Sequence, residues 1–222
     1  MDLQRKEEEA VMIIGMTGGI GAGKSRVLQI LKDKYKVFVI EADQVAKDLE
    51  QPGQEGLNGL VKIFGDKILS SDGTLNKDLF SKLIFGNPDA LKKVNALIHP
   101  LVWARIRQMS RESSADLIVV EAALFDENSR RVCDFLVCVD TDPQIRMERL
   151  MKNRGYSREK CLEIMAKQQD RESFVQLSDY VIHNDGTPEE VEQEIARMME
   201  TISGSDPTLN GQDEKIRQEG AQ

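Results

Sequence analysis

The sequence predicts an α/β fold in which helices flank a five-stranded, mostly parallel sheet. Three observations support this prediction. Short β-branched runs alternate with stretches of helical spacing, a glycine-rich stretch joins the first run to the first helical stretch, and one long helical segment interrupts the alternation. A chain of 222 residues is long enough for one domain that carries an inserted subdomain.

The first strand, helix and second strand are predicted near the N-terminus. Residues 11–15 form an apolar run bounded by glycine, which is typical of a buried parallel strand. Residues 24–34 carry apolar side chains at helical spacing, and residues 36–41 return to a β-branched pattern. This region is therefore predicted to run strand, loop, helix, strand.

A long segment separates the second predicted strand from the third. It covers about residues 43–114, has helical patterning, and contains turn signals at residues 52–53, 72–73 and 87–88. A simple loop in such a fold has roughly 2 to 6 residues. We therefore expect an inserted helical subdomain here.

Three further apolar runs predict the remaining strands, at residues 116–122, 134–140 and 179–184. Between the last two lies a charged, helical excursion of about residues 151–177, with Gly155 at a break. The predicted domain spans residues 11–202. Its core comprises residues 11–42, 115–150 and 178–202, between an N-terminal extension (1–10) and a polar tail (203–222) expected to be disordered.

Composition excludes several classes of protein. A net charge of −8 and a pI near 5.0 argue against nucleic-acid binding, which needs a basic surface. No apolar run approaches the ~20 residues of a membrane span, and acidic residues stand where a signal peptide would be basic, so we expect a cytoplasmic protein without membrane contact. Cys133, Cys138 and Cys161 lack metal or disulfide spacing, and we expect reduced packing residues.

The glycine-rich stretch predicts a phosphate-binding loop. Residues 18–25 (GGIGAGKS) fit G-x-x-x-x-G-K-[ST] between a strand and a helix. The glycines let backbone N–H groups surround a phosphate, Lys24 adds a positive charge for the β- and γ-phosphates, and Ser25 offers a hydroxyl to Mg²⁺. The predicted ATP-binding residues are Gly18, Gly19, Ile20, Gly21, Ala22, Gly23, Lys24, Ser25 and Arg26. For Arg26, a position beside the phosphates and one facing solvent are both open.

Two acidic residues follow predicted strands at the sheet edge where ligands gather. Asp43 is a candidate functional residue, and the alternative is that it caps a helix beginning at Gln44. Glu121 is a candidate ligand of magnesium through water, and the alternative is a solvated or helix-capping acid. Position alone leaves both alternatives open.

Basic candidates lie in the helical segments. His99 precedes Pro100, which would open a helix, so a cap or a buried histidine is the alternative to a binding role. Arg146, Arg149 and Arg154 follow the fourth strand, where a closing segment would bring cations over a transferring phosphate. A solvated helix face is the alternative for each arginine.

Several separated motifs together resemble the dephospho-coenzyme A kinase family, over about residues 12–199. These motifs are GMTGGIGAGKS (15–25), EADQVAKDL (41–49) followed by QPG (51–53), FG (64–65), DGTLN (72–76), LIHPLV (97–102), EAALF (121–125) and SDYVIHNDG (178–186). The resemblance implies a P-loop NTPase fold and transfer of the ATP γ-phosphoryl group to the ribose 3′-hydroxyl of dephospho-coenzyme A. ATP and dephospho-coenzyme A would be the partners, with Mg²⁺ as cofactor and no protein partner implied.

The resemblance also implies roles for single residues. Asp43 matches the second acid of the family's Asp-Ala-Asp motif, the base for the acceptor hydroxyl, and catalysis would further involve Lys24, Arg149 and Arg154. The inserted helical subdomain of about residues 43–114 would bind the acceptor, with Asp43, Lys77 and His99 in the site, and residues 151–177 would form a small lid. The metal would be bound by Ser25, whereas Glu121 is a metal candidate from its position alone.

The chain departs from the family pattern at four positions. Glu41 replaces the first acid of Asp-Ala-Asp, Lys77 stands where many relatives have arginine, and Glu121 stands where the family often has proline. The lid usually carries Arg-Asp before its glycine, whereas this chain has Asn153-Arg154. The lid arginine is therefore either Arg154, after a shift of one residue, or Arg149, which matches a family arginine.

Two other functions remain open from the sequence. A nucleoside monophosphate kinase would share the loop and the lid. A nucleotide-operated switch that binds a protein partner would belong to another class, and Asn76-Lys77-Asp78 superficially resembles the guanine-reading N-K-x-D. In this chain the aspartate comes one residue early and no strand precedes the triplet.

Overall fold

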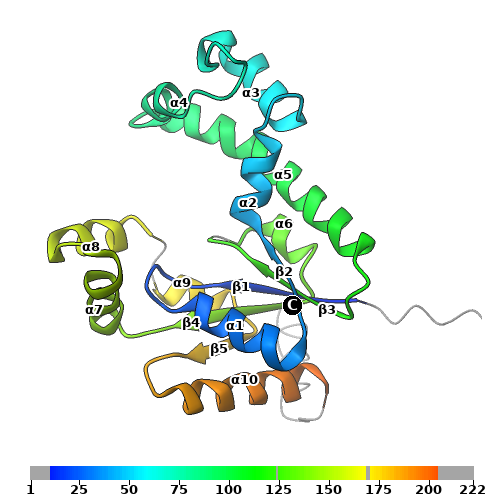
Figure 1. Ribbon diagram of the computed structural model, residues 1–222, viewed down its shortest axis with the longest axis vertical. Coiled ribbons are helices and arrows are strands. Elements are labelled where there is room, and N and C mark those ends of the chain that lie inside the picture. Colours follow the sequence, from blue (N-terminus) through cyan, green and yellow to red (C-terminus); the bar gives the residue numbers. More distant parts are fainter. Residues whose placement is uncertain (1–10, 124, 169–170, 205–222) are drawn as a thin grey trace, which may run out of the picture. The chain divides into compact units, whose positions relative to one another are not determined.

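The computed structural model describes residues 11–123, 125–168 and 171–204. Its five-stranded sheet has the order β2-β3-β1-β4-β5, and the pairs β2/β3 and β4/β5 are parallel (Figure 1). The strands are β1 (Met12–Thr17), β2 (Phe38–Glu41), β3 (Leu117–Glu121), β4 (Phe135–Asp140) and β5 (Tyr180–His183). All five predicted strands are confirmed within a few residues, and so is the parallel sheet. The predicted extension (1–10) lies outside the described residues, as does the predicted tail apart from Ser203 and Gly204.

The described chain divides into two compact units. The first contains the described residues up to Gly15 together with Val37–Asp134, and the second contains Met16–Lys36 and the described residues from Phe135 onward. The phosphate loop therefore belongs to the second unit, and the long helical segment belongs to the first. The predicted division into core, insertion and lid remains a prediction.

Helices dominate the first unit between β2 and β3. They are α2 (Ala42–Leu49), α3 (Glu55–Phe64), a 3₁₀ turn η1 (Asp66–Ile68), α4 (Lys77–Ile84) and α5 (Pro88–Glu112), while a short α6 (Glu127–Arg130) follows β3. The helices α2, α3 and α4 all pack against α5 (Figure 1). The helical character predicted for residues 43–114 is thus confirmed.

Helix α5 corrects one sequence expectation. Pro100 lies inside this helix and does not open it. The helix begins at Pro88, where the Asn87 side chain accepts a hydrogen bond from the Ala90 N–H and proline occupies the first turn, which needs no N–H partner. Buried side chains on both sides of Pro100, including Ile98 and Val102, stabilise the helix through the proline.

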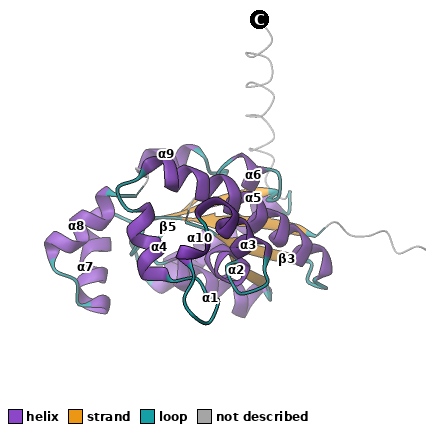
Figure 2. Ribbon diagram, turned by 90° about the horizontal axis from the view of Figure 1, so that it is seen from above, coloured by secondary structure: helices purple, strands orange, loops and turns teal. Residues whose placement is uncertain are grey.

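The second unit places its helices around the phosphate loop and the last two strands. These helices are α1 (Lys24–Tyr35), α7 (Pro143–Arg154), α8 (Arg158–Ala166), α9 (Arg171–Gln176) and α10 (Pro188–Ile202). Helices α7 and α8 lie side by side (Figure 2), and Cys161 packs between Met147 and Leu150. Gly155 ends α7 with φ 64°, a left-handed conformation that glycine adopts without strain, so the predicted break is confirmed.

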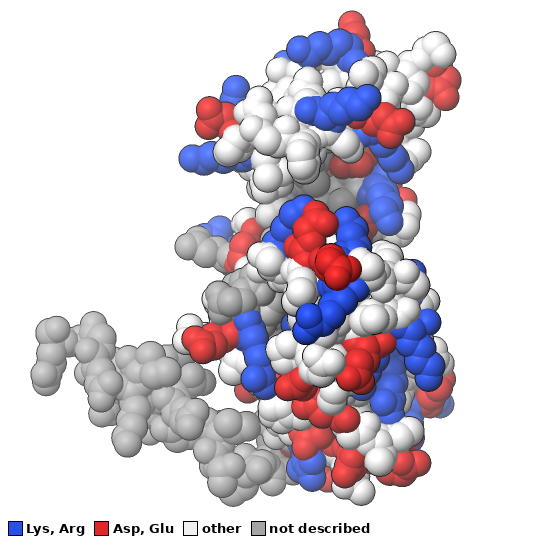
Figure 3. All heavy atoms as spheres, turned by 90° about the vertical axis from the view of Figure 1, so that its left-hand side faces the viewer, with Lys and Arg blue, Asp and Glu red and all other residues white. Residues whose placement is uncertain are grey.

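The state of the cysteines and the distribution of surface charge agree with what the composition predicts. The three cysteines are free and buried, and burial raises the pKa of Cys133 to about 12 and that of Cys138 to about 11, so neither thiol is reactive near neutral pH. Acidic and basic side chains are interspersed over the face drawn in Figure 3. Among the described residues, no helix combines the length and apolar character that crossing a membrane requires.

Candidate active site

The loop between β1 and α1 is closely packed and folds back on itself. The Lys24 Nζ atom donates a hydrogen bond to the Gly18 carbonyl oxygen at 3.0 Å, which holds the ammonium group over the loop. Gly23 begins α1 with φ 89°, and a Cβ atom there would collide with the Asn184 amide. A Cβ atom at Gly18 would collide with the Val139 carbonyl oxygen. Glycine is therefore required at both positions by sterics within the second unit.

Arg146 and Gln168 hold the middle of the loop. The Arg146 Nε atom donates to the Ile20 carbonyl oxygen at 2.9 Å, and its Nη2 atom donates to the Gln168 Oε1 atom at 3.0 Å. The same Oε1 atom accepts a hydrogen bond from the Ile20 N–H at 2.9 Å. Arg146 thus binds and positions the backbone of the phosphate loop. Gln168 was missed by sequence reasoning, since it lies 148 positions from its partner.

The Ala22 carbonyl oxygen is the second anchor of the loop. It accepts hydrogen bonds from Asn184 Nδ2 at 2.6 Å, Thr141 Oγ1 at 2.9 Å and Arg149 Nη1 at 3.4 Å. Arg149 also donates from Nη2 to the Asn184 carbonyl oxygen at 2.8 Å. Arg154, in contrast, is exposed at the last position of α7. The structure therefore brings Arg149, and not Arg154, into contact with the loop.

Arg26 lies partly buried beside the same asparagine. Its Nη1 atom donates to the Asn184 Oδ1 atom at 3.4 Å, while its Nη2 atom is buried without a hydrogen-bond partner among the described residues. The alternative that Arg26 faces solvent is therefore wrong. A buried guanidinium N–H that lacks a protein partner is suited to an added acceptor such as a nucleotide oxygen.

An ion pair between a buried carboxylate and an exposed arginine lies at the end of β4. The Asp140 carboxylate accepts two hydrogen bonds from Arg171, at 2.8 and 2.5 Å, and its Oδ2 atom lies 3.5 Å from His183 Nδ1. These hydrogen bonds from Arg171 hold the pKa of Asp140 below its ordinary value. The pair joins α9 to β4, and neither partner was singled out from the sequence.

On the first unit, Asp43 lies in the first turn of α2. The helix begins at Ala42, so the alternative that Asp43 caps a helix beginning at Gln44 is wrong. The exposed Asp43 side chain lines a cavity of about 370 Å³ together with His99 and Trp103. Most of the other lining residues are apolar: Ala42, Ala46, Phe80, Ile84, Leu91, Val94, Ile98, Val102, Ala122 and Ala123, with Glu50 and Asn95 as the polar ones. The structure thus brings two of the predicted acceptor-binding residues to one cavity.

His99 has an acidic partner. Its Nδ1 atom lies 3.4 Å from the Asp126 Oδ2 atom, and Asp126 also caps α6. Burial alone would raise the pKa of Asp126, but hydrogen bonds from Ser129, Asn128 and His99 together lower it. Asp126 therefore orients the imidazole, and the expectation that His99 caps a helix at Pro100 is wrong.

Oxygen donors are available for a metal ion in each unit. Ser25 is exposed in the first turn of α1, which suits a hydroxyl that contacts Mg²⁺ beside nucleotide phosphates. Glu121 ends β3 and pairs in register with Glu41 at the end of β2, so two carboxylates adjoin there. Among the described residues, no group of three or more His, Cys, Asp or Glu side chains forms a metal cluster. These donors fit Mg²⁺, which keeps several waters and substrate oxygens and needs few protein ligands.

Asn76 and Lys77 lie at the start of α4. The Asn76 side chain accepts a hydrogen bond from the Leu79 N–H at 3.0 Å and caps the helix. The likeness of Asn76-Lys77-Asp78 to a guanine-reading motif is therefore explained by a helix cap. Lys77 is exposed and faces a smaller cavity of this unit.

The strand, the glycine loop closed by Lys24, and the following helix, set in a parallel sheet, place the chain in the class of phosphate-loop α/β kinases. The family model described as dephospho-CoA kinase matches residues 12–190, and the chain belongs to this family. The expected fold class and family are thus confirmed.

Individual relatives agree with this assignment. A dephospho-CoA kinase of Streptomyces avermitilis is 37% identical over 184 residues, which cover 82% of this chain and 89% of that protein. The crystal structure of a Thermus thermophilus protein superposes with a TM-score of 0.70 and 26% identity, covering 85% of this chain and 96% of that one. A dephospho-CoA kinase from Campylobacter jejuni has a TM-score of 0.61 at 22% identity, covers 87% and 98% of the two chains, and supports the fold.

Proposed function

We propose that the protein transfers the γ-phosphoryl group of ATP to the ribose 3′-hydroxyl of dephospho-coenzyme A and so forms coenzyme A, the last step of its synthesis. Membership of the dephospho-CoA kinase family over residues 12–190 is the observation that carries this proposal. The phosphate loop in one unit and the apolar cavity lined by Asp43 and His99 in the other support it. A cytoplasmic location remains a prediction.

The donor nucleotide would bind at the loop of residues 18–26. Backbone N–H groups of the loop and the start of α1 favour anionic oxygens, and Lys24 adds a full positive charge beside them. Ser25 would bind Mg²⁺, with Glu121 as a second candidate. The bound ion would neutralise charge on the β- and γ-phosphate oxygens.

The loop must already have its binding shape when the nucleotide arrives. Arg146 and Gln168 hold Ile20, while Thr141, Arg149 and Asn184 hold Ala22. Because these hydrogen bonds fix the loop backbone, the other N–H groups of the loop would keep their orientation when the phosphates bind. Such preorganisation lowers the free energy of the transition state without reorganisation during the reaction.

The acceptor would bind in the cavity of the first unit. Its apolar walls suit the adenine or the pantetheine part, and Asp43 would orient the 3′-hydroxyl and accept its proton as the phosphoryl group is transferred. His99, held by Asp126, would donate a hydrogen bond to the acceptor. Lys77 would bind an anionic part of the acceptor. Positioning of the two substrates would supply most of the rate acceleration.

A comparison of acceptors tests the proposal. Purified protein with MgATP should form coenzyme A from dephospho-coenzyme A, measured by chromatography, with a far higher kcat/KM than for AMP or CMP. Phosphorylation of AMP or CMP with no coenzyme A formed would favour a nucleoside monophosphate kinase. The family assignment does not favour that alternative or a nucleotide switch.

A further inference from the structure

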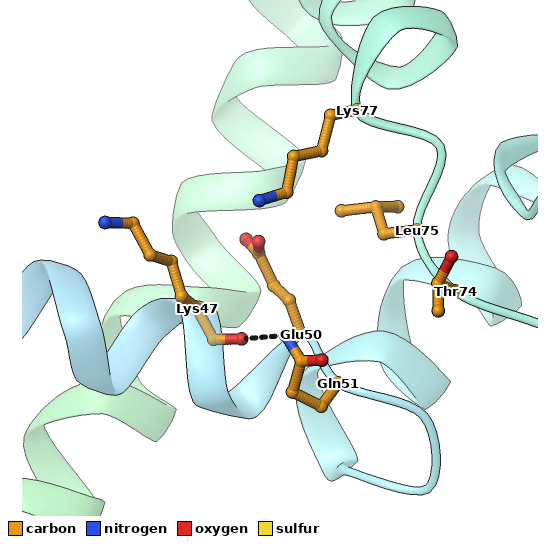
Figure 4. Close-up of a pocket in the computed structure, with 6 residues that line it drawn as sticks. All are labelled: Lys47, Glu50, Gln51, Thr74, Leu75 and Lys77. Atoms are coloured by element: carbon orange, nitrogen blue, oxygen red, sulfur yellow. Dashed lines mark hydrogen bonds between the residues drawn. The ribbon is translucent and has the colours of Figure 1, made fainter.

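A small polar cavity lies between the end of α2 and the segment that precedes α4. It measures about 180 Å³ and is lined by Lys47, Glu50, Gln51, Thr74, Leu75 and Lys77 (Figure 4). All six residues belong to the first unit, and two of the three charged side chains are lysines. The cavity therefore has a net positive charge, in a chain whose net charge is −8.

Both lysines line the cavity, but only Lys77 points toward the Glu50 carboxylate. In Figure 4 the Lys77 ammonium group points toward the Glu50 carboxylate from the α4 side, and Lys47 extends along α2 on the other side. Among the described residues, no ion pair of 4.0 Å or less joins Glu50 to either lysine. The lysines thus remain available to a second anion.

Glu50 is poorly suited to keep its charge at this position. Burial raises the pKa of its carboxyl group, and the lysines, Lys77 more than Lys47, offset only part of that effect. A protonated Glu50 would leave two positive charges facing one cavity. An anion that enters would itself stabilise that protonated form, because like charges avoid each other.

The polar cavity adjoins the acceptor cavity through a shared residue. Glu50 lines both cavities, and the larger one also contains Asp43 and His99. An elongated ligand whose reacting hydroxyl lies near Asp43 would therefore extend past Glu50 toward the lysines. Dephospho-coenzyme A carries its diphosphate a short distance from the reacting ribose, so the two features match.

We propose that Lys47 and Lys77 bind the diphosphate of the acceptor, and that Glu50 occupies this site as a carboxylate until the diphosphate enters. On binding, Glu50 takes up one proton from solvent and the two lysines pair with phosphate oxygens. This inference rests on the proposed function. It adds a specific anion site and a coupling between acceptor binding and proton uptake.

Isothermal titration calorimetry of dephospho-coenzyme A binding, without ATP, measures this coupling. Titrations near neutral pH in two buffers of different ionisation enthalpy give the number of protons taken up. The wild-type protein should take up protons, since the diphosphate diester has no ionisation of its own near neutral pH. Glu50→Gln should show no uptake and should bind about tenfold more tightly, because it removes one negative charge from the anion site.

Matched variants separate this site from its neighbours. Glu55→Gln makes the same change of charge at an exposed position in the first turn of α3 and should behave as wild type. Lys47→Met and Lys77→Met should each weaken acceptor binding by about tenfold. Proton uptake that persists in Glu50→Gln would place the proton on another group facing the cavities, such as His99 or Asp43, and would overturn the proposal.

Inorganic diphosphate tests whether the site binds the diphosphate of the acceptor or a free anion. It should compete with dephospho-coenzyme A, and more strongly in Glu50→Gln than in the wild type. This competition is measured with the phosphate loop occupied by a non-hydrolysable ATP analogue, and diphosphate that then binds without competing would overturn the assignment to the acceptor. If coenzyme A forms while Glu50→Gln matches wild type in affinity and uptake, only this inference fails; if no coenzyme A forms at all, the proposed function fails.

Discussion

At the scale of single residues, Arg149 and Arg154 belong to the same helix but differ in their contacts, because only Arg149 reaches the phosphate loop. Replacing Arg149 with methionine removes hydrogen bonds to the Ala22 and Asn184 carbonyl oxygens and lets the phosphate loop shift. We expect kcat/KM to fall by about a hundredfold, since small misplacements near a reacting group have effects of that size. Steady-state kinetics of both variants measure this. Arg154→Met should lose little, and the opposite ranking would make Arg154 the lid arginine.

The role of Asp43 can be tested in the same assay. Asp43→Asn keeps the size of the side chain but cannot accept the proton of the acceptor hydroxyl, so kcat should fall by about 10² to 10⁴-fold. The affinity for ATP should remain that of the parent, because Asp43 belongs to the unit without the phosphate loop. Turnover close to that of the parent would exclude Asp43 as the base.

The ion pair of the buried Asp140 with the exposed Arg171 gives a prediction for stability. The pKa of Asp140 is lowered in the folded state, so its stabilising contribution is present above the ordinary pKa of an aspartate and is lost as the pH falls through the lower folded value. Arg171→Met leaves the carboxylate buried without its main partner. We expect a loss of about 1–3 kcal/mol in the free energy of unfolding at neutral pH.

Urea unfolding at neutral and acidic pH measures this difference, which should narrow as the pH falls below the ordinary pKa of ~3.9. Arg197→Met is a suitable control, because Arg197 pairs with Glu194 on the surface of α10, where ion pairs contribute little. A difference between wild type and Arg171→Met that is the same at both pH values would contradict the account.

Residues of the site were predictable where they sit in a local motif. The loop residues and Asp43 follow strands that the pattern of apolar residues already revealed. Gln168, Asn184, Thr141 and Asp126 were missed because their hydrogen-bond partners are distant in the sequence, as for Asn184 and Ala22, which are 162 positions apart. Such pairs depend on how the chain folds back, and no local pattern encodes them.

At the scale of elements, strands and most helices followed from periodicity, while the order of the strands did not. Strand order depends on which crossovers form, and the sequence spacing alone does not determine it. Pro100 shows the limit of local signals. A proline usually starts or breaks a helix, but the apolar face of α5 is buried along most of its length and stabilises the helix through it.

In the first unit, the cavity lined by Asp43 contains a tryptophan whose fluorescence can report acceptor binding. Trp103 is the only tryptophan of the chain, lines the cavity with Asp43 and packs against Phe125 at 6.4 Å between ring centres. Dephospho-coenzyme A should therefore cause a saturable change in intrinsic fluorescence in the absence of ATP. A titration that shows no change while coenzyme A is formed would mean that the acceptor binds elsewhere.

At the scale of the whole molecule, an acidic chain must bind two anionic substrates. We propose that it does so with local groups: backbone N–H groups and Lys24 at the loop, and Lys47 and Lys77 in the helical unit. Composition could exclude a nucleic-acid binder, because that function needs a basic surface. It could not locate the cations, because their positions depend on the fold of each unit.

The fate of the γ-phosphate tests the central claim most directly. The protein is incubated with ATP labelled at the γ-phosphate and with dephospho-coenzyme A, and the labelled products are separated and identified by phosphorus NMR. The account predicts label in coenzyme A, as a monoester on the ribose 3′-oxygen, with one ADP formed for each coenzyme A. Label found only in free phosphate, with dephospho-coenzyme A unchanged, would contradict it.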